Sequence, residues 1–90
     1  MMINIKNTPL SIEMNKDQIV CYIHDGNVIF YFKKNKFGWV DECTKYILSI
    51  DQVFDIIEEY IYETNDEEDY IIAKDSLEKI KNMENRYERN

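Results

Sequence analysis

The side chains best suited to chemistry are the carboxylates of one acidic stretch, EEYIYETNDEEDY, at residues 58–70. It contains seven Asp or Glu residues and no Lys or Arg. The four adjacent acids at 66–69 could ligate calcium through their oxygens. A calcium loop of the EF-hand type, however, needs alternating ligands and a glycine at its sixth position, and this stretch has neither. We therefore predict no metal site and interpret 66–69 as part of a solvated run.

Two catalytic arrangements can be weighed against the same sequence. Paired carboxylates catalyse proton transfer when one of them is desolvated, but these acids are expected on an exposed helix face. His24, with Cys21 and Asp25 nearby, suggests a nucleophile. In the hairpin described below, Cys21 faces the core and His24 faces the opposite side. We therefore predict that the protein is not an enzyme and needs no cofactor.

Charge is distributed very unevenly along the chain. The net charge is -7, and residues 46–73 contain nine acidic and no basic residues. Such a block repels nucleic acid and anionic membranes and attracts basic protein surfaces. Four lysines near two aromatic residues could bind nucleic acid, but the net charge opposes phosphate contacts. We interpret these lysines as residues that keep a turn or sheet edge soluble; the lysines are Lys33, Lys34, Lys36 and Lys45, and the aromatic residues are Phe37 and Trp39.

The clearest structural signal is a β-hairpin over residues 18–33. Two β-rich runs flank Asp25-Gly26, a dipeptide favoured in two-residue type I′ turns. This turn sets a register that gives one apolar core face. The facing pairs are Ile23 with Val28, Cys21 with Phe30, and Ile19 with Phe32.

A helix is predicted over residues 49–64. Ser49 and Gln52 fit a capping box at its start. Apolar residues follow helical spacing at positions 50, 53, 54, 57 and 61, and the opposite side is acidic. An acidic loop is predicted over 65–74, in which 70–73 fits either a short strand or a first helical turn. Asp75 and Glu78 then fit the start of a second helix over 75–88.

These elements predict an α+β fold for residues 1–90 as a single domain. Residues 1–48 form mainly a β meander, in which 37–48 fits either one strand or two. The hairpin and the first helix each have one apolar face, and the two faces can cover each other. We therefore expect an antiparallel sheet of about four strands, with one helix packed on a face and a second, C-terminal helix.

The acidic helix face and loop form the predicted partner-binding surface. Like charges four residues apart on a helix repel each other, and no basic residue separates them here. A basic partner would relieve this repulsion, and tyrosine commonly anchors protein interfaces. The predicted binding residues are Asp51, Asp55, Glu58, Glu59, Tyr62, Glu63, Asp66, Glu67, Glu68 and Asp69.

The segment YILSIDQVFDIIEEYIYET, residues 46–64, resembles the strand-to-helix segment of some small bacterial immunity proteins that neutralise nuclease toxins. The resemblance lies in layout, a twisted antiparallel sheet followed by this segment, and it transfers no binding residue. It implies a non-enzymatic inhibitor that blocks a nuclease toxin through an acidic, phosphate-mimicking surface. Phage-encoded inhibitors of bacterial defence, including anti-CRISPR proteins, are similar in size, composition and acidity, and they give the alternative function.

The expected partner is a basic protein, a nuclease or another nucleic-acid-binding protein, with no direct contact to nucleic acid or membrane. No apolar run reaches the length of a membrane span, and MMINIKNTPL lacks the features of a secretory signal. We therefore expect a cytoplasmic protein in which Cys21 and Cys43 are free thiols. A homo-oligomeric structural or adaptor domain is the alternative of another class. It would form a homodimer through the second hairpin face, made of Val20, Tyr22, Ile29 and Tyr31.

Overall fold

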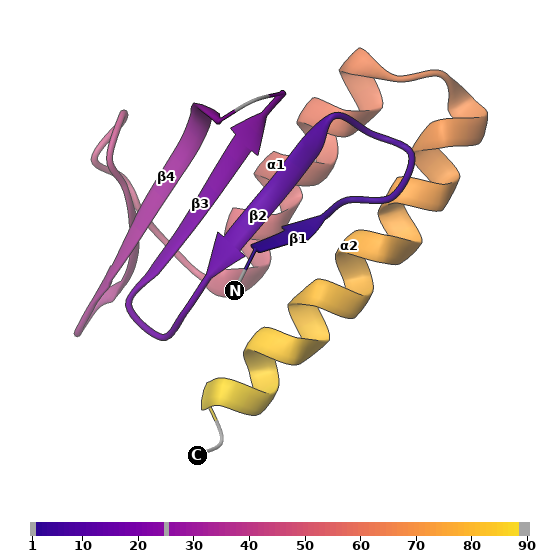
Figure 1. Ribbon diagram of the computed structural model, residues 1–90. Helices are drawn as coiled ribbons and strands as arrows, with labels where there is room; N and C mark the ends of the chain where they lie inside the picture. Colours follow the sequence, from indigo (N-terminus) through magenta and orange to yellow (C-terminus); the bar gives the residue numbers. More distant parts are fainter. Residues whose placement is uncertain (1, 25, 89–90) are drawn as a thin grey trace.

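An antiparallel sheet followed by two helices makes up the fold (Figure 1). The computed structural model describes residues 2–24 and 26–88, and their side chains as far as Met83. Within these residues the elements are β1 (Met2–Asn4), β2 (Leu10–Met14), β3 (Gln18–Ile23), β4 (Asn27–Asn35), β5 (Gly38–Asp41), β6 (Ile47–Leu48), α1 (Ile50–Thr64) and α2 (Glu67–Glu88). The strands lie in the sheet in chain order, so each pairs with its neighbours in sequence. The α+β class is confirmed, and the described residues form six strands where about four were predicted.

One face of the sheet and both helices share a single hydrophobic core. Figure 1 shows α1 running behind the sheet and α2 running alongside β1. The predicted packing of the hairpin's apolar face against the helix is confirmed, and α2 adds a third side to the core. The buried core residues are Ile5, Leu10, Ile12, Met14, Ile19, Cys21, Phe32, Trp39, Val53, Phe54, Ile57, Ile61, Ala73, Leu77 and Ile80.

The β3–β4 hairpin keeps the predicted register only at the end away from its turn, where Ile19 pairs with Phe32 and Cys21 with Phe30. The register then shifts because Ile29 is an extra residue in β4, which makes a β-bulge. Val28 therefore pairs with Tyr22 rather than Ile23, and 53% of its surface is exposed. The prediction that Val28 lies on the core face was wrong, because alternating apolar residues do not reveal a bulge. The predicted turn includes Asp25, which lies outside the described residues.

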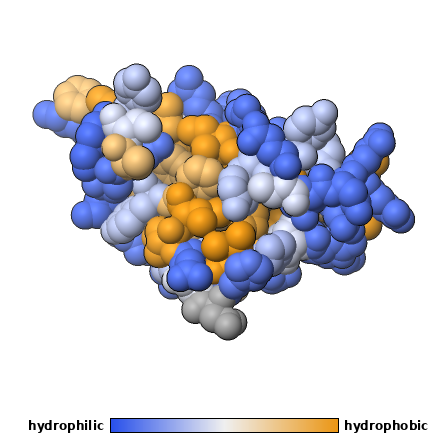
Figure 2. All heavy atoms as spheres, turned by 90° about the horizontal axis from the view of Figure 1, so that it is seen from above, coloured by the Kyte–Doolittle hydropathy of each residue, from blue (hydrophilic) through white to orange (hydrophobic). Residues whose placement is uncertain are grey.

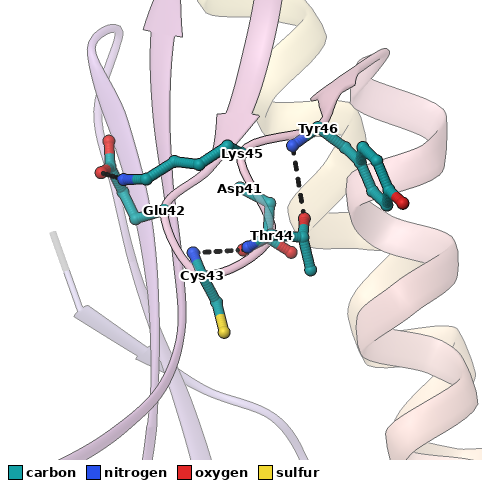
Figure 3. Close-up of polar contacts among 6 residues, drawn as sticks. All are labelled: Asp41, Glu42, Cys43, Thr44, Lys45 and Tyr46. Atoms are coloured by element: carbon teal, nitrogen blue, oxygen red, sulfur yellow. Dashed lines mark hydrogen bonds and ion pairs between the residues drawn. The ribbon is translucent and has the colours of Figure 1, made fainter.

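The segment 37–48 forms two strands joined by a tight turn (Figure 3). The carboxylate of Asp41 accepts hydrogen bonds from the backbone N–H groups of Cys43 at 2.8 Å and Thr44 at 3.3 Å. Lys45 has a positive φ of 67° and donates its backbone N–H to the carbonyl of Asp41 at 2.7 Å. Asp41 thus organises the turn, and it does so through a short side chain that bonds its own following backbone.

Ser49 caps α1 as predicted. Its hydroxyl accepts a hydrogen bond from the backbone N–H of Gln52 at 3.2 Å, and the Gln52 side chain accepts one from the Ser49 N–H at 2.8 Å. Both halves of the predicted capping box are therefore present. At the other end, Asn65 donates its backbone N–H and its side-chain amide to the carbonyl of Ile61 at 3.1 and 3.0 Å. Asn65 thereby ends the helix.

The second helix begins at Glu67 rather than at residue 75, so the predicted acidic loop over 65–74 was wrong. The carboxylate of Asp66 accepts a hydrogen bond from the backbone N–H of Asp69 at 2.9 Å, which is the contact of a helix N-cap. The acids that follow are favoured in a first helical turn, because the helix dipole places positive charge there. The acidic residues predicted to form a loop therefore form the first turn of α2.

Two further expectations for α2 change with this boundary. Asp75 lies inside the helix, where its carboxylate pairs with Lys79 at 3.2 Å, so it does not cap the helix with Glu78. Residues 70–73 are helical, which settles their conformation. Over the part of the chain that the structure describes, neither helix is both long enough and apolar enough to cross a membrane.

The turn between β1 and β2 joins the sheet to α2. The backbone N–H of Lys6 donates to the hydroxyl of Ser76 at 3.2 Å, and the side-chain amide of Asn7 donates to the carboxylate of Asp69 at 3.2 Å. Ile5, the residue before Lys6, is fully buried in the core. The N-terminal turn therefore holds α2 against the edge of the sheet.

Candidate protein-binding surface

The predicted binding residues divide into two groups in the structure. Asp51, Asp55 and Glu58 lie on the side of α1 that meets α2, where they approach lysines of the second helix. The others lie farther along α1, in the connection, or in the first turn of α2. The two groups have different surroundings, so the acidic stretch is not one uniform surface.

The first group forms what we call the helix seam, the contact between α1 and α2 lined by Asp51, Asp55, Glu58, Lys74 and Lys81. Lys81 approaches the carboxylate of Asp51 at 2.6 Å, and Lys74 approaches that of Glu58 at 3.5 Å. The pKa of Lys81 is raised, mainly by its hydrogen bond to Asp51 and further by nearby acids including Asp55, against the opposing effect of burial. Lys74 and Lys81 thus offset part of the negative charge predicted for this stripe, and Asp55 has no ion-pair partner among the described side chains.

The sequence analysis did not place Lys74 and Lys81 beside the acids of α1. The predicted second helix began at residue 75, so it did not contain Lys74. A signal for both was present, since residues seven apart lie on the same face of a continuous helix. Leu77 lies between them in sequence and is buried in the core. A helix that buries Leu77 against α1 brings both lysines to the seam.

Glu58 has a structural role as well as a charge. It is half-buried, and its carboxylate accepts a hydrogen bond from the hydroxyl of Tyr70 at 3.2 Å. Burial raises the pKa of Tyr70, and the negative charge of Glu58 raises it further. The expectation that Glu58 faces solvent was wrong, because α2 passes directly beside it.

The acids of the α1–α2 connection also have local roles. Asp66 caps α2, and Asp69 accepts the hydrogen bond from Asn7. Glu67 and Glu68 are exposed in the first turn, where the helix dipole favours them. The described residues contain no group of three or more His, Cys, Asp or Glu side chains arranged to bind a metal ion.

Between the end of α1 and the start of α2 lies a groove of about 610 Å³, which we call the junction groove. Tyr62 and Ile71 are 66% and 60% exposed, and the ring of Tyr62 meets that of Tyr70 edge-on at 5.1 Å. Across residues 2–24 and 26–83, no basic side chain forms an ion pair with either glutamate of this groove. The lining residues are Tyr62, Glu63, Asn65, Glu67, Tyr70 and Ile71.

The lysines considered for nucleic-acid binding are engaged with their own neighbours. The ammonium groups of Lys33, Lys34 and Lys36 lie 5.8, 5.6 and 5.2 Å from the centres of the rings of Tyr31, Trp39 and Phe37. Lys45 pairs with Glu42 at 2.9 Å, as Figure 3 shows. Trp39 is buried in the core and presents no free ring face. Three of the four lysines thus lie over aromatic rings near the β4–β5 turn, and the fourth is paired with an acid.

Cys21 and His24 are placed apart, as the hairpin pattern suggested. Cys21 is fully buried, and burial raises the pKa of its thiol to about 12. His24 is exposed at the turn, has a positive φ of 54° and donates its backbone N–H to the carbonyl of Pro9 at 3.0 Å. The two side chains therefore do not form a nucleophile with its base.

The second hairpin face is less open than predicted. Val20 is only 4% exposed, since it pairs with Glu13 on one side and Tyr31 on the other. Tyr22 donates its hydroxyl to Glu13 at 3.2 Å, and Tyr31 donates its own to Gln18 at 3.0 Å. Burial raises the pKa of Tyr22, and its hydrogen bond to Glu13 raises it further. Both tyrosine hydroxyls are thus engaged by neighbouring side chains, and Val20 is buried between its strand neighbours.

A second groove, of about 440 Å³, lies beside the part of β4 that pairs with β3 on one side and has no strand on the other. Pairing of β4 with β5 begins at Phe32, and the last contact beyond it is the N–H of Glu42 to the carbonyl of Tyr31 at 2.9 Å. Figure 2, which views this end of the molecule, shows hydrophobic residues gathered near the middle. We call this the β4 groove; it is lined by Val28, Ile29, Phe30, Tyr31, Asp41, Glu42, Cys43 and Thr44.

The junction groove, the β4 groove and the partly neutralised helix seam are thus three surfaces on which a function can be built. The junction groove combines exposed apolar side chains with acids that have no ion-pair partner among the described side chains. The β4 groove is the more apolar of the two in its strand residues. Comparison with protein-family models, with curated proteins and with solved structures found no match for this chain.

Proposed function

We propose that the protein is a non-enzymatic inhibitor that binds a basic protein. The observation that carries this proposal is the end of the molecule where α1 meets α2. Four exposed glutamates gather there, and none has an ion-pair partner among the side chains that the structure describes. Two of them, Glu63 and Glu67, line the same groove as the exposed ring of Tyr62. The four glutamates are Glu59, Glu63, Glu67 and Glu68.

The mechanism follows from the charge and from the exposed aromatic ring. Carboxylates at this end would occupy positions that phosphates take in the cleft of a nucleic-acid-binding protein. Long-range attraction would speed association, and burial of Tyr62 on binding would slow dissociation. The helix seam contributes less than the sequence suggested, because Lys74 and Lys81 neutralise part of it.

Immunity to a nuclease toxin is the leading form of this function. A phage-encoded inhibitor of bacterial defence, of the anti-CRISPR kind, is the alternative. Both functions would use the same acidic surface, so the surface does not distinguish one function from the other. The neighbouring gene does: a toxin gene immediately upstream favours immunity, and a phage early region favours the anti-defence role.

The test is a charge reversal that leaves the junction groove intact. The double variant Glu59→Lys/Glu68→Lys changes two exposed acids outside the groove lining. The control variant Asp17→Lys/Asp75→Lys makes the same change in net charge at exposed positions elsewhere. Each tagged protein is used to capture partners from a lysate of the native host, and captured proteins are identified by mass spectrometry and assayed for nuclease activity.

We expect the wild type and the control to retain a basic protein and to inhibit its activity. The Glu59→Lys/Glu68→Lys variant should bind it about ten-fold more weakly or worse at low salt, with a smaller difference at high salt. Equal affinity for all three folded proteins would remove the acidic end from the mechanism. A captured enzyme that stays active in the complex would contradict inhibition.

A homo-oligomeric role remains the proposal of another class, and the β4 groove is the observation that favours it. Val28 is exposed there beside a strand edge without a neighbour in the described structure. Light scattering on the purified protein tests it. A dimer that becomes monomeric in Val28→Lys would support pairing through β4, and a monomer at high concentration would rule it out.

A further inference from the structure

We propose that the junction groove receives an arginine side chain of the basic partner, an inference that rests on the proposed function. The groove takes residues from both helices, and its wall is part apolar and part acidic. A cationic side chain with a flat, weakly hydrated head matches both parts. Arginine has such a head, whereas the ammonium of lysine is compact and strongly hydrated.

The apolar wall is held in place before any partner arrives. The ring of Tyr70 lies 5.1 Å from that of Tyr62, with an angle of 78° between their planes. Tyr70 is itself fixed, because its hydroxyl donates to Glu58 and Glu58 pairs with Lys74. Tyr62 therefore presents its ring from a braced position, and a guanidinium can stack on an aromatic face of this kind.

Neither glutamate of the charged wall has an ion-pair partner among side chains 2–24 and 26–83. Glu63 comes from the last turn of α1 and Glu67 from the first residue of α2, so the two helices place one carboxylate each in the groove. Lys74, two turns farther along α2 than Glu67, is held by Glu58. A guanidinium offers five N–H donors in a plane and can bond carboxylates on more than one side while it stacks.

Exposure of the apolar residues also argues for an occupant. Tyr62 and Ile71 both line the groove and are exposed, whereas the other large apolar side chains of α1, and of α2 as far as Met83, are buried or half-buried. Covering them with the carbon stem of an arginine would remove apolar surface from water while the head meets the glutamates. The groove thus has an apolar part for the stem of an arginine and an acidic part for its guanidinium.

The probes are two capped peptides of equal length and charge, one with arginines and one with lysines separated by glycines. Each is titrated into isotopically labelled protein at low salt, and binding is followed by NMR. We expect the arginine peptide to bind at least about three-fold more tightly. The largest chemical-shift changes should fall at Tyr62, Glu63, Glu67, Tyr70 and Ile71.

Two variants and one matched control locate the preference. Tyr62→Ser and Ile71→Ser change exposed side chains and should each abolish the preference for arginine. Tyr46→Ser removes a tyrosine that is 70% exposed on the β5–β6 turn, and it should leave the preference unchanged. The double variant Glu63→Gln/Glu67→Gln should bind neither peptide, which would show that the two glutamates of the groove are needed for binding.

Three results would overturn the proposal. They are equal affinity for the two peptides, an arginine preference that survives in Tyr62→Ser, and no binding of either peptide. None of them decides the proposed function, which is tested separately by the Glu59→Lys/Glu68→Lys variant and its captured partner. If that variant loses its partner while the arginine preference is absent, the acidic end binds a basic protein without using the groove.

Discussion

The ammonium of Lys81 on α2 lies 2.6 Å from a carboxylate oxygen of Asp51, in the first turn of α1. The pair links the beginning of one helix to a late turn of the other. A predicted binding residue is thus engaged by another element of the same molecule. Asp51 is 69% exposed, which limits the free energy that the pair contributes.

Lys81→Met should lower the free energy of unfolding by about 0.5 kcal/mol at pH 7. The folded-state pKa of Lys81 is raised above its ordinary value of 10.5, chiefly by the hydrogen bond to Asp51. The contribution is therefore complete below pH 10.5 and is lost as the pH rises through the folded-state pKa. Urea unfolding of wild type and variant at pH 7 and in alkaline buffer measures the difference. A difference that stays constant with pH would contradict a charge-based contact.

Glu58→Lys and Glu59→Lys should differ sharply although they are neighbours. Glu58 accepts from Tyr70 and pairs with Lys74, so its replacement removes both contacts and places two ammonium groups together. We expect a loss of about 1–2 kcal/mol in unfolding free energy. Glu59 is exposed, and its replacement should change stability by less than about 0.5 kcal/mol. Equal melting temperatures for the two variants would show that Glu58 has no structural role.

The first helix could be predicted almost to the residue, whereas the second could not. Ser49 and Gln52 give a local capping signal, and the buried residues of α1 repeat with helical spacing. The start of α2 depends on Asp66 as a cap and on the preference of acids for a first turn, and the same letters also suit a solvated loop. Composition alone does not separate the two.

Part of the candidate surface could be predicted, because the excess of acids between residues 46 and 73 is visible in the sequence. Which acids remain open could not, because the lysines that neutralise Asp51 and Glu58 come from another helix. The bulge at Ile29 is a similar case, since one extra residue changes the pairing without changing the apolar pattern. Both depend on contacts between elements.

The two cysteines should react at very different rates. Cys43 is exposed on the β5–β6 turn, whereas Cys21 is fully buried with a pKa raised to about 12. Brief treatment with iodoacetamide at pH 8 should modify Cys43 about ten-fold faster than Cys21, or more. Peptide mass spectrometry identifies the modified residue, and a sample in urea provides the unfolded reference. Rapid modification of Cys21 in the folded protein would contradict its place in the core.

Gly38→Ala should destabilise the protein through a backbone clash. Gly38 has a φ of +146°, and an added Cβ would lie 2.8 Å from the carbonyl oxygen of Leu48. We expect a loss on the order of 2–3 kcal/mol. Gly26→Ala is the matched control, since Gly26 has a φ of +104° but no atom within 4 Å of the added carbon. It should lose about 1 kcal/mol, and an equal loss for both would show that the clash is relieved.

The chain-order arrangement of the strands has a consequence for how the protein assembles. Every strand pairs with the strand that precedes or follows it, so the sheet needs only short loops to close and can form early. The contacts of Lys6 and Asn7 with α2 are different, because they join positions 70 and 62 residues apart. During synthesis all six strands can therefore be present before α2 has been made. The N-terminal turn can bind α2 only afterwards, so its contacts with α2 form late in folding.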